Sequence, residues 1–179
     1  HISNLGIRIV ETGLKTGFIA EIGQGEPIIA LRADIDALPI RAANTFDYAS
    51  KNGAMHACGH DFHQTSLLGA AELLKAKEAD IKGTIRLIFQ PAEEVATGAD
   101  AVIEAGGIEG VSAVIGYHNN PHLKPGQISL RSKAIMAAVE KFKVTVTGVS
   151  GHAARPDFGI DTILTITTIV NNLQAIISR

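Results

Sequence analysis

The chain has 179 residues, of which 46% are hydrophobic and 19% charged, a balance typical of a protein that folds around a core. The net charge of −2 and the 4% aromatic content argue against a nucleic-acid-binding or anionic-membrane surface. No apolar run reaches the roughly 18 residues that predict a membrane span. The single cysteine forms no internal disulfide, which predicts a reducing compartment, the cytoplasm.

Residues 1–132 are predicted to form an α/β domain. The runs FIAEI and PIIALRADID are rich in strand formers and are separated by the turn residues GQGEP. Residues 61–79 carry apolar side chains at helical spacings of three and four. A strand at GTIRLIFQP, a short helix at 99–105 and a strand at VSAVIGYH follow. Because nearly continuous apolar strands alternate with helices, we expect a mainly parallel sheet between two helical layers, a three-layer α/β/α arrangement.

The pattern changes after Pro125, and we place a second domain at residues 133–179. GQISLRS (126–132) is predicted to be a short strand, and residues 139–147 alternate strictly, as a strand with one solvated face does. Apolar residues at helical spacing predict a helix over residues 157–178. The chain begins at His1 rather than Met and ends within this helical pattern, so we expect a fragment of a longer protein.

The segment MHACGHDFH (55–63) concentrates side chains that bind metal ions. In an extended backbone Cys58 and His60 project to the same side, and Gly59 between them allows a close approach to an ion. A thiolate and an imidazole together suit Zn²⁺ or a similar metal. The alternative is a buried cysteine that packs as a small apolar side chain beside polar residues that begin a helix.

Three predicted strands end in further candidate ligands. Asp34 and Asp36 follow the first, Glu93 and Glu94 the second, and His118 the third. Each of these residues could have a structural role instead, such as capping a turn or placing an acid at a helix N-terminus. Their shared position favours function, because open α/β sheets gather their functional groups at the carboxyl ends of strands. Of two adjacent carboxylates, one can bind an ion while its neighbour takes a proton from water. A thiolate can bridge two ions, and we assign that role to Cys58.

Five motifs resemble one family in their order and spacing. They are LRADIDALPI, MHACGHDFHQTSLLGAA, IFQPAEE, GYHNNPHLKPGQI and GVSGHAARPDFGID, which cover most of residues 30–161. The chain resembles the aminoacylase and hippurate-hydrolase branch of the co-catalytic zinc metallopeptidases. That branch includes bacterial N-acyl-amino-acid amidohydrolases and plant auxin-conjugate hydrolases.

The resemblance implies a di-metal exopeptidase-like site with two divalent ions, Zn, Mn, Co or Ni. The implied ligands are Cys58, His60, Glu94 and His118. Glu93 would be the general base, and Asp36 would orient a ligand. His152 would stabilise the oxyanion and reach the active site of a neighbouring subunit. Arg155 would bind a substrate carboxylate, or would form a surface ion pair instead.

The implied reaction is hydrolysis of the amide bond of N-acyl-amino acids or similar small conjugates by a metal-activated water. Residues 133–179 would begin an α+β, ferredoxin-like lid that mediates dimerisation. The family's C-terminal half, with a further metal-binding histidine, is missing from the matched region, so we expect partial metal occupancy and an inactive fragment. Phe62 also stands where relatives usually have a small residue. Two alternatives remain open: a cysteine hydrolase that uses Cys58, which leaves the two glutamates unexplained, and a non-catalytic metal-binding or assembly module.

Overall fold

The computed structural model describes residues 1–177. Its contacts divide the chain into two compact units, the first ending at Gln127 and the second beginning at Ile128. This division lies a few residues before the predicted domain boundary at 132/133. No helix among the described residues is long and apolar enough to cross a membrane.

The first unit is built on a five-stranded sheet in the order β1-β2-β4-β3-β5. Its strands are β1 Arg8–Val10, β2 Phe18–Gln24, β3 Ile28–Asp34, β4 Gly83–Gln90 and β5 Val111–Gly116. The β1–β2 and β2–β4 pairs are antiparallel, whereas the β4–β3 and β3–β5 pairs are parallel. The α/β class is confirmed: β1, β3, β4 and β5 run in one direction, and the single opposed strand β2 makes this mainly parallel sheet a mixed one. Only three residues, GEP, connect β2 to β3. Two parallel strands need a crossover of a dozen or more residues, so this short connection makes β3 run opposite to β2.

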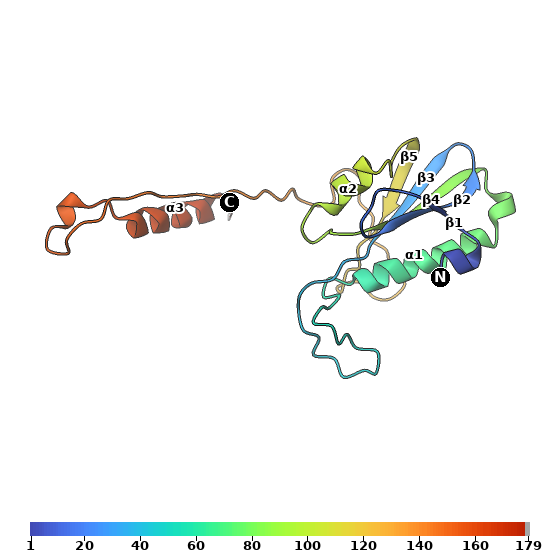
Figure 1. Ribbon diagram of the computed structural model, residues 1–179, viewed down its shortest axis with the longest axis horizontal. Helices are drawn as coiled ribbons and strands as arrows, with labels where there is room; N and C mark the ends of the chain where they lie inside the picture. Colours follow the sequence, from blue (N-terminus) through green and yellow to red (C-terminus); the bar gives the residue numbers. More distant parts are fainter. Residues whose placement is uncertain (178–179) are drawn as a thin grey trace. The chain divides into compact units, whose positions relative to one another are not determined.

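Helices cover both faces of this sheet, as the predicted three-layer arrangement requires (Figure 1). Helix α1, His60–Lys75, packs Leu67 and Ala71 against the side of the sheet that includes Leu87 and Phe89. Helix α2, Gly98–Glu104, packs Val102 against Ala30 and Ile88 on the opposite side. Successive residues of β4 thus serve opposite cores, because side chains alternate along a strand. Helix α1 ends at Lys75, before the predicted end at residue 79, and a 3₁₀ turn at Glu78–Asp80 follows it.

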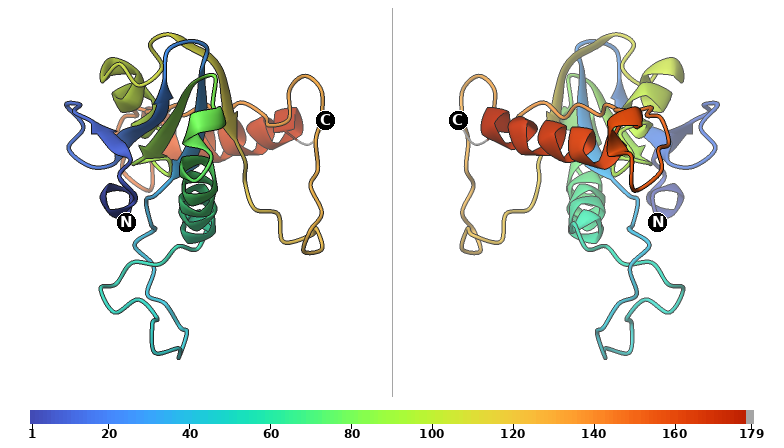
Figure 2. Two further views of the ribbon diagram at one scale, coloured as in Figure 1. Left: turned by 90° about the vertical axis from the view of Figure 1, so that its right-hand side faces the viewer. Right: turned by 90° about the vertical axis from the view of Figure 1, so that its left-hand side faces the viewer.

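A long irregular segment, residues 35–59, connects β3 to α1. Leu38 and Met55 exchange two backbone hydrogen bonds, of 3.0 and 2.9 Å, that close the base of this loop. Figure 2 shows the segment (cyan) leaving the sheet and returning to the start of α1. The loop therefore returns residues 56–60 to the carboxyl end of β3, where Asp36 lies.

The second unit contains a 3₁₀ turn at Pro156–Phe158 and helix α3, Thr162–Ile177. Helix α3 corresponds to the predicted helix 157–178, of which Ser178 lies outside the described residues. The two predicted strands at 126–132 and 139–147 are wrong: over residues 126–155, all described, the only pairing is a single bridge from Val149 to Ile160. Alternation favours an extended backbone, but a strand also needs a partner for its backbone groups. The ferredoxin-like lid stays a prediction.

Candidate metal centre

The candidate centre lies where three neighbouring strands end. Asp34 is the last residue of β3, Glu93 and Glu94 follow β4, and His118 follows β5. Because β3 pairs in parallel with both β4 and β5, their carboxyl ends share one edge of the sheet. The start of α1 delivers His60 to the same edge.

The donor atoms of these residues form three overlapping groups that share His60. In each group the donor atoms lie within 4.8 Å of one another. The groups are Cys58–His60–His118, His60–Glu93–Glu94 and Asp34–His60–His63. The structure thus brings together all four predicted ligands and the predicted general base, although they come from segments up to 60 residues apart.

The clearest sign of a cation is the Nε2 atom of His60. This side chain is 1% exposed, and its Nδ1 lies 3.0 Å from the Asp36 carbonyl oxygen and 3.1 Å from Asp36 Oδ1. Nε2 is buried without a hydrogen-bond partner among the described residues. Carboxylate oxygens of Asp34, Glu94 and Glu93 lie 3.7, 3.8 and 3.9 Å from it. A buried nitrogen lone pair facing three carboxylates fits a divalent cation, because an unpaired buried polar atom is otherwise destabilising.

Asp36 connects the segments that carry the candidate ligands. Its carbonyl oxygen lies 3.0 Å from Nδ1 of both His56 and His60. Its Oδ2 accepts a 3.0 Å hydrogen bond from the backbone N–H of Glu94. One aspartate thus orients the His60 ring and holds the turn that carries the two glutamates.

The two glutamates sit on a tight turn after β4. Ala92 and Ala96 have φ angles of 52° and 56°, in the left-handed region that is unfavourable for alanine. Backbone bonds from Ala96 N–H to Glu93 O (2.8 Å) and from Gly98 N–H to Ala92 O (3.1 Å) hold this backbone. The Glu93 side chain is 41% exposed and that of Glu94 is 22% exposed. This difference favours Glu94 as the ligand and Glu93 as the group that reaches solvent and substrate.

Cys58 and His118 approach each other beside His60. Cys58 Sγ lies 3.3 Å from His118 Nε2, while His118 Nδ1 donates to the Asn119 carbonyl oxygen at 2.8 Å. Burial raises the pKa of the Cys58 thiol, and the charges of Glu94 and Glu93 raise it further. A thiolate here therefore requires a compensating cation.

Gly59 is required between Cys58 and His60 for two reasons. Its φ of 86° lies in the left-handed region, and a Cβ there would come within 2.5 Å of Asn119 Oδ1. Glycine at this position thus permits the close approach of the Asn119 side chain, in addition to the predicted close approach to an ion.

His152 and Arg155 belong to the second unit. His152 is exposed, and its Nδ1 accepts a 3.1 Å hydrogen bond from the Ala154 N–H. Arg155 forms a double ion pair with Asp157, at 3.0 and 2.8 Å, and lies over the Phe158 ring. The hydrogen bonds from the Arg155 guanidinium lower the pKa of the Asp157 carboxyl. The surface ion pair anticipated for Arg155 is thus present, and the catalytic and substrate-binding roles of both residues stay predictions.

Sequence reasoning missed a buried network behind the centre. Asp34 Oδ1 lies 2.6 Å from His63 Nδ1, and Asp34 Oδ2 accepts a 2.7 Å bond from Arg32. Burial raises the pKa of the Asp34 carboxyl, but the His63 hydrogen bond and the Arg32 charge outweigh burial and lower it. The available signal was the spacing of His60 and His63, three residues apart on one helix face.

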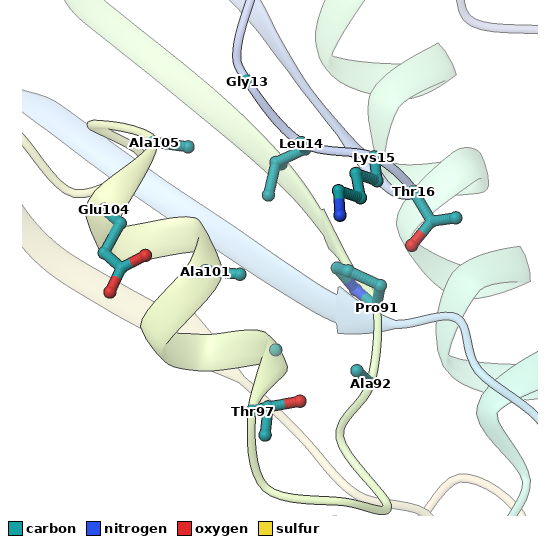
Figure 3. Close-up of a pocket in the computed structure, with 11 residues that line it drawn as sticks. Gly13, Leu14, Lys15, Thr16, Pro91, Ala92, Thr97, Ala101, Glu104 and Ala105 are labelled. Carbon is teal, nitrogen blue, oxygen red and sulfur yellow. The ribbon is translucent and has the colours of Figure 1, made fainter.

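A separate hollow of about 420 Å³ lies on the α2 side of the sheet. Figure 3 shows Leu14, Lys15 and Thr16 on one side of it, α2 on the other, and Pro91 and Ala92 between them. None of the predicted ligands lines this hollow. The candidate chemistry therefore belongs to the strand-end cluster and not to this cavity.

Thiolate, imidazole and carboxylate donors at the carboxyl ends of parallel strands define a metal-binding α/β domain. The chain belongs to the peptidase family M20/M25/M40, whose family model matches residues 30–172. This match confirms the resemblance inferred from the five motifs.

Several similar proteins have named activities, among them two bacterial enzymes. N-acetyl-L-cysteine deacetylase of Bacillus subtilis is 53% identical over 177 aligned positions, which cover 97% of this chain and 42% of that protein. N-acyl-L-amino acid amidohydrolase of Geobacillus stearothermophilus is 44% identical over 169 positions, which cover 92% of this chain and 46% of that protein. The chain therefore spans less than half the length of these relatives.

The fold is shared with several solved structures, among them two bacterial proteins. The Bacillus subtilis YXEP protein, described as a dinuclear metal-binding peptidase of the M20 family, matches with a TM-score of 0.65 and 55% identity over 68% of this chain and 35% of its own. A protein of methicillin-resistant Staphylococcus aureus, named for a proposed aminohydrolase activity, matches with a TM-score of 0.81 and 32% identity over 99% of this chain and 48% of its own. The predicted fold class is confirmed.

Proposed function

We propose that this chain supplies the metal-binding part of an amidohydrolase that cleaves the amide bond of N-acyl-amino acids. The observation that carries the proposal is the unpartnered Nε2 of buried His60, which faces three carboxylates beside the Cys58–His118 pair. The named relatives support the substrate class, because both act on N-acylated amino acids.

The proposed ligands are Cys58, His60, Glu94 and His118. Two divalent ions held there, Zn, Mn, Co or Ni, would lower the pKa of a water molecule and polarise the amide carbonyl. Glu93 would take a proton from that water, and the water oxygen would form the new bond to the carbonyl carbon. Glu93 then returns the proton to the amide nitrogen as the carbon–nitrogen bond breaks, releasing a carboxylate and an amino acid. Asp36 keeps the His60 ring oriented throughout.

The finer proposals concern the second unit. We assign residues 133–179 to the beginning of a lid that pairs two copies of the protein. His152 would then stabilise the oxyanion in the neighbouring copy. Arg155 would have to share its guanidinium with Asp157 to bind a substrate carboxylate. The single cysteine supports a cytoplasmic location.

A cysteine hydrolase is the second candidate, since Cys58 Sγ lies 3.3 Å from His118 Nε2. A cysteine nucleophile works as a thiolate, and nucleophilic cysteines have a lowered pKa. Burial and two nearby glutamates instead raise the pKa of Cys58. The carboxylate pair, which would help a metal hydrolase, would hinder a thiolate nucleophile. A non-catalytic module, the third alternative, has no use for an exposed carboxylate such as Glu93 beside the ligands.

Chelation decides among these functions. N-acetyl- and N-benzoyl-amino acids are offered to this chain and to the longest natural polypeptide that contains it, with and without EDTA, and released amino acid is measured. We expect hydrolysis by the longer polypeptide, its loss with EDTA, and its return with Zn²⁺ or Mn²⁺. Hydrolysis that resists metal removal would favour the cysteine mechanism. Metal binding without any hydrolysis would favour the non-catalytic module.

A further inference from the structure

His63 lies between the two histidines proposed as ligands but has no nitrogen free to bind an ion. Its ring centroid is 5.4 Å from that of His60 and 4.7 Å from that of His118. Nδ1 lies 2.6 Å from Asp34 Oδ1. Nε2 lies 2.9 Å from the Asn119 backbone nitrogen and 2.6 Å from Asn119 Oδ1. Nε2 either accepts a hydrogen bond from the Asn119 N–H or donates one to Asn119 Oδ1, depending on the tautomer. In both cases each ring nitrogen is hydrogen-bonded, Nδ1 to Asp34 and Nε2 to Asn119.

The network that holds His63 is buried and anchored to the sheet. The His63 and Asp34 side chains are 0% and 1% exposed. Arg32 donates to Asp34 Oδ2 at 2.7 Å and to Gln90 Oε1 at 2.9 Å, which ties the ends of β3 and β4 together. A buried carboxylate with both oxygens engaged keeps one geometry, because any shift would leave a charged group unpaired.

Asn119 transfers this geometry to His118. Its carbonyl oxygen accepts the hydrogen bond from His118 Nδ1 at 2.8 Å, which turns His118 Nε2 toward Cys58. Its side chain also packs against Gly59, between Cys58 and His60. Asn119 thus contacts the turn that carries two proposed ligands and fixes the ring of a third.

We propose that His63 is a positioning residue which, held by Asp34, sets the place of Asn119 and through it the approach of His118 Nε2 to Cys58 and His60. The inference rests on the proposed metal centre. It assigns His63 no contact with substrate or metal. Its consequence is that His63 controls how tightly the His118 side of the centre holds an ion.

Two substitutions of His63 separate its two contacts. In His63→Asn the amide can replace Nδ1 at Asp34 but is too short to reach Asn119. In His63→Gln the amide can occupy the place of Nε2 and keep the Asn119 contact. We expect His63→Asn to weaken Co²⁺ binding by about 10–100-fold, the usual effect of losing a residue that orients a ligand, and His63→Gln to weaken it less.

The experiment titrates the 179-residue chain with Co²⁺ and follows two readouts, the affinity and the absorption spectrum. Thiolate-to-cobalt absorption reports on Cys58, and the ligand-field bands report on the number of ligands. We expect the His63→Asn spectrum to resemble that of His118→Ala. His122→Asn is the matched histidine control, since His122 is exposed and belongs to no donor group. Leu67→Ala, a buried position on the same helix, controls for lost stability.

The outcomes distinguish this inference from the proposed function. If the unaltered chain binds no Co²⁺ in a manner that depends on Cys58, the metal centre is wrong and this inference is wrong with it. If the unaltered chain binds Co²⁺ and His63→Asn binds it equally well, only this inference is overturned. An equal loss in His63→Asn and Leu67→Ala at matched stability would also overturn it, because that loss would reflect the fold alone.

Discussion

The two units use similar sequence patterns and reach different degrees of packing. The first unit contains every fully buried residue among those described, including Ile19, Ile22 and Leu87 at 0–1% exposure. Over residues 128–176 no residue is buried. Leu130 and Val139, which follow strand-like patterns, are 90% and 85% exposed. The difference teaches that an alternating pattern produces a buried strand only where another segment of the chain pairs with it and covers it.

The chemistry follows the same division. All four proposed ligands and Glu93 lie in the first unit, where the sheet holds the strand ends in register. His152 and Arg155 lie on the surface of the second. We therefore expect substitutions in the first unit to change catalysis or stability strongly, and those in the second to act mainly through association.

The largest effect is expected at Glu93. In the longest natural polypeptide that contains this chain, Glu93→Gln should keep bound metal and lose about 10²–10⁴-fold in turnover, the usual contribution of a general base. Glu94→Gln should release metal. Metal content and amidohydrolase rate, measured on both variants, test the assignment. Loss of metal from Glu93→Gln with full activity in Glu94→Gln would reverse the two roles.

Two phenylalanines test the packing difference directly. Phe89 is 2% exposed and stacks on Phe18, whereas Phe142 is 72% exposed. We expect Phe89→Ala to lower the free energy of unfolding by about 3–5 kcal/mol. Phe142→Ala should change it by less than about 0.5 kcal/mol, as surface substitutions do. Urea denaturation measures both. A comparable loss from the two variants would mean that the second unit is packed after all.

Zinc should stabilise the first unit alone. A ligand present at 100 times its dissociation constant stabilises a folded protein by roughly 2.7 kcal/mol. Because the chain spans less than half the length of the relatives it matches, we expect further ligands to lie outside it, and therefore weak or partial occupancy and a smaller stabilisation. Elemental analysis and amide chemical shifts, recorded during a zinc titration, measure occupancy and location. Two tightly held ions in this chain would show that its own residues supply all the ligands that the ions need.

The smallest effect should be on oligomeric state. Exposed apolar side chains of the second unit, such as Ile163 and Leu164 at 73% and 67% exposure, favour contact with a second copy. Burying apolar surface contributes roughly 25 cal/mol per Å². Light scattering on the chain with and without residues 133–179 should give a dimer or larger species only when that segment is present. A monomer in both cases would contradict the proposed lid interface.

Local patterns predicted most elements of the first unit and the residues of the candidate site. Strands β2 to β5 and helix α2 begin and end within two residues of their predicted positions, because apolar periodicity and turn residues are local properties of the chain. The gathering of Glu93, Glu94 and His118 at one sheet edge followed from one general rule about strand ends, whereas Cys58 and His60 were candidates through the segment MHACGHDFH. Asp34 was a candidate at a strand end and His63 lies in the metal-binding segment 55–63, but nothing local linked them to Asn119, which is 56 residues from His63.

By itself the sequence determined which residues can form strands and helices, and which side chains can bind a metal. Only the tertiary structure decided that β4 lies between β2 and β3, which makes the sheet mixed, and that residues 139–147 form no strand among the described residues. It also decided that His63 is held by Asp34 and Asn119 rather than left free for an ion. The physical reason is common to all three. Strand pairing and buried hydrogen bonds join residues that are distant in sequence, and their geometry depends on which segments the whole chain brings together.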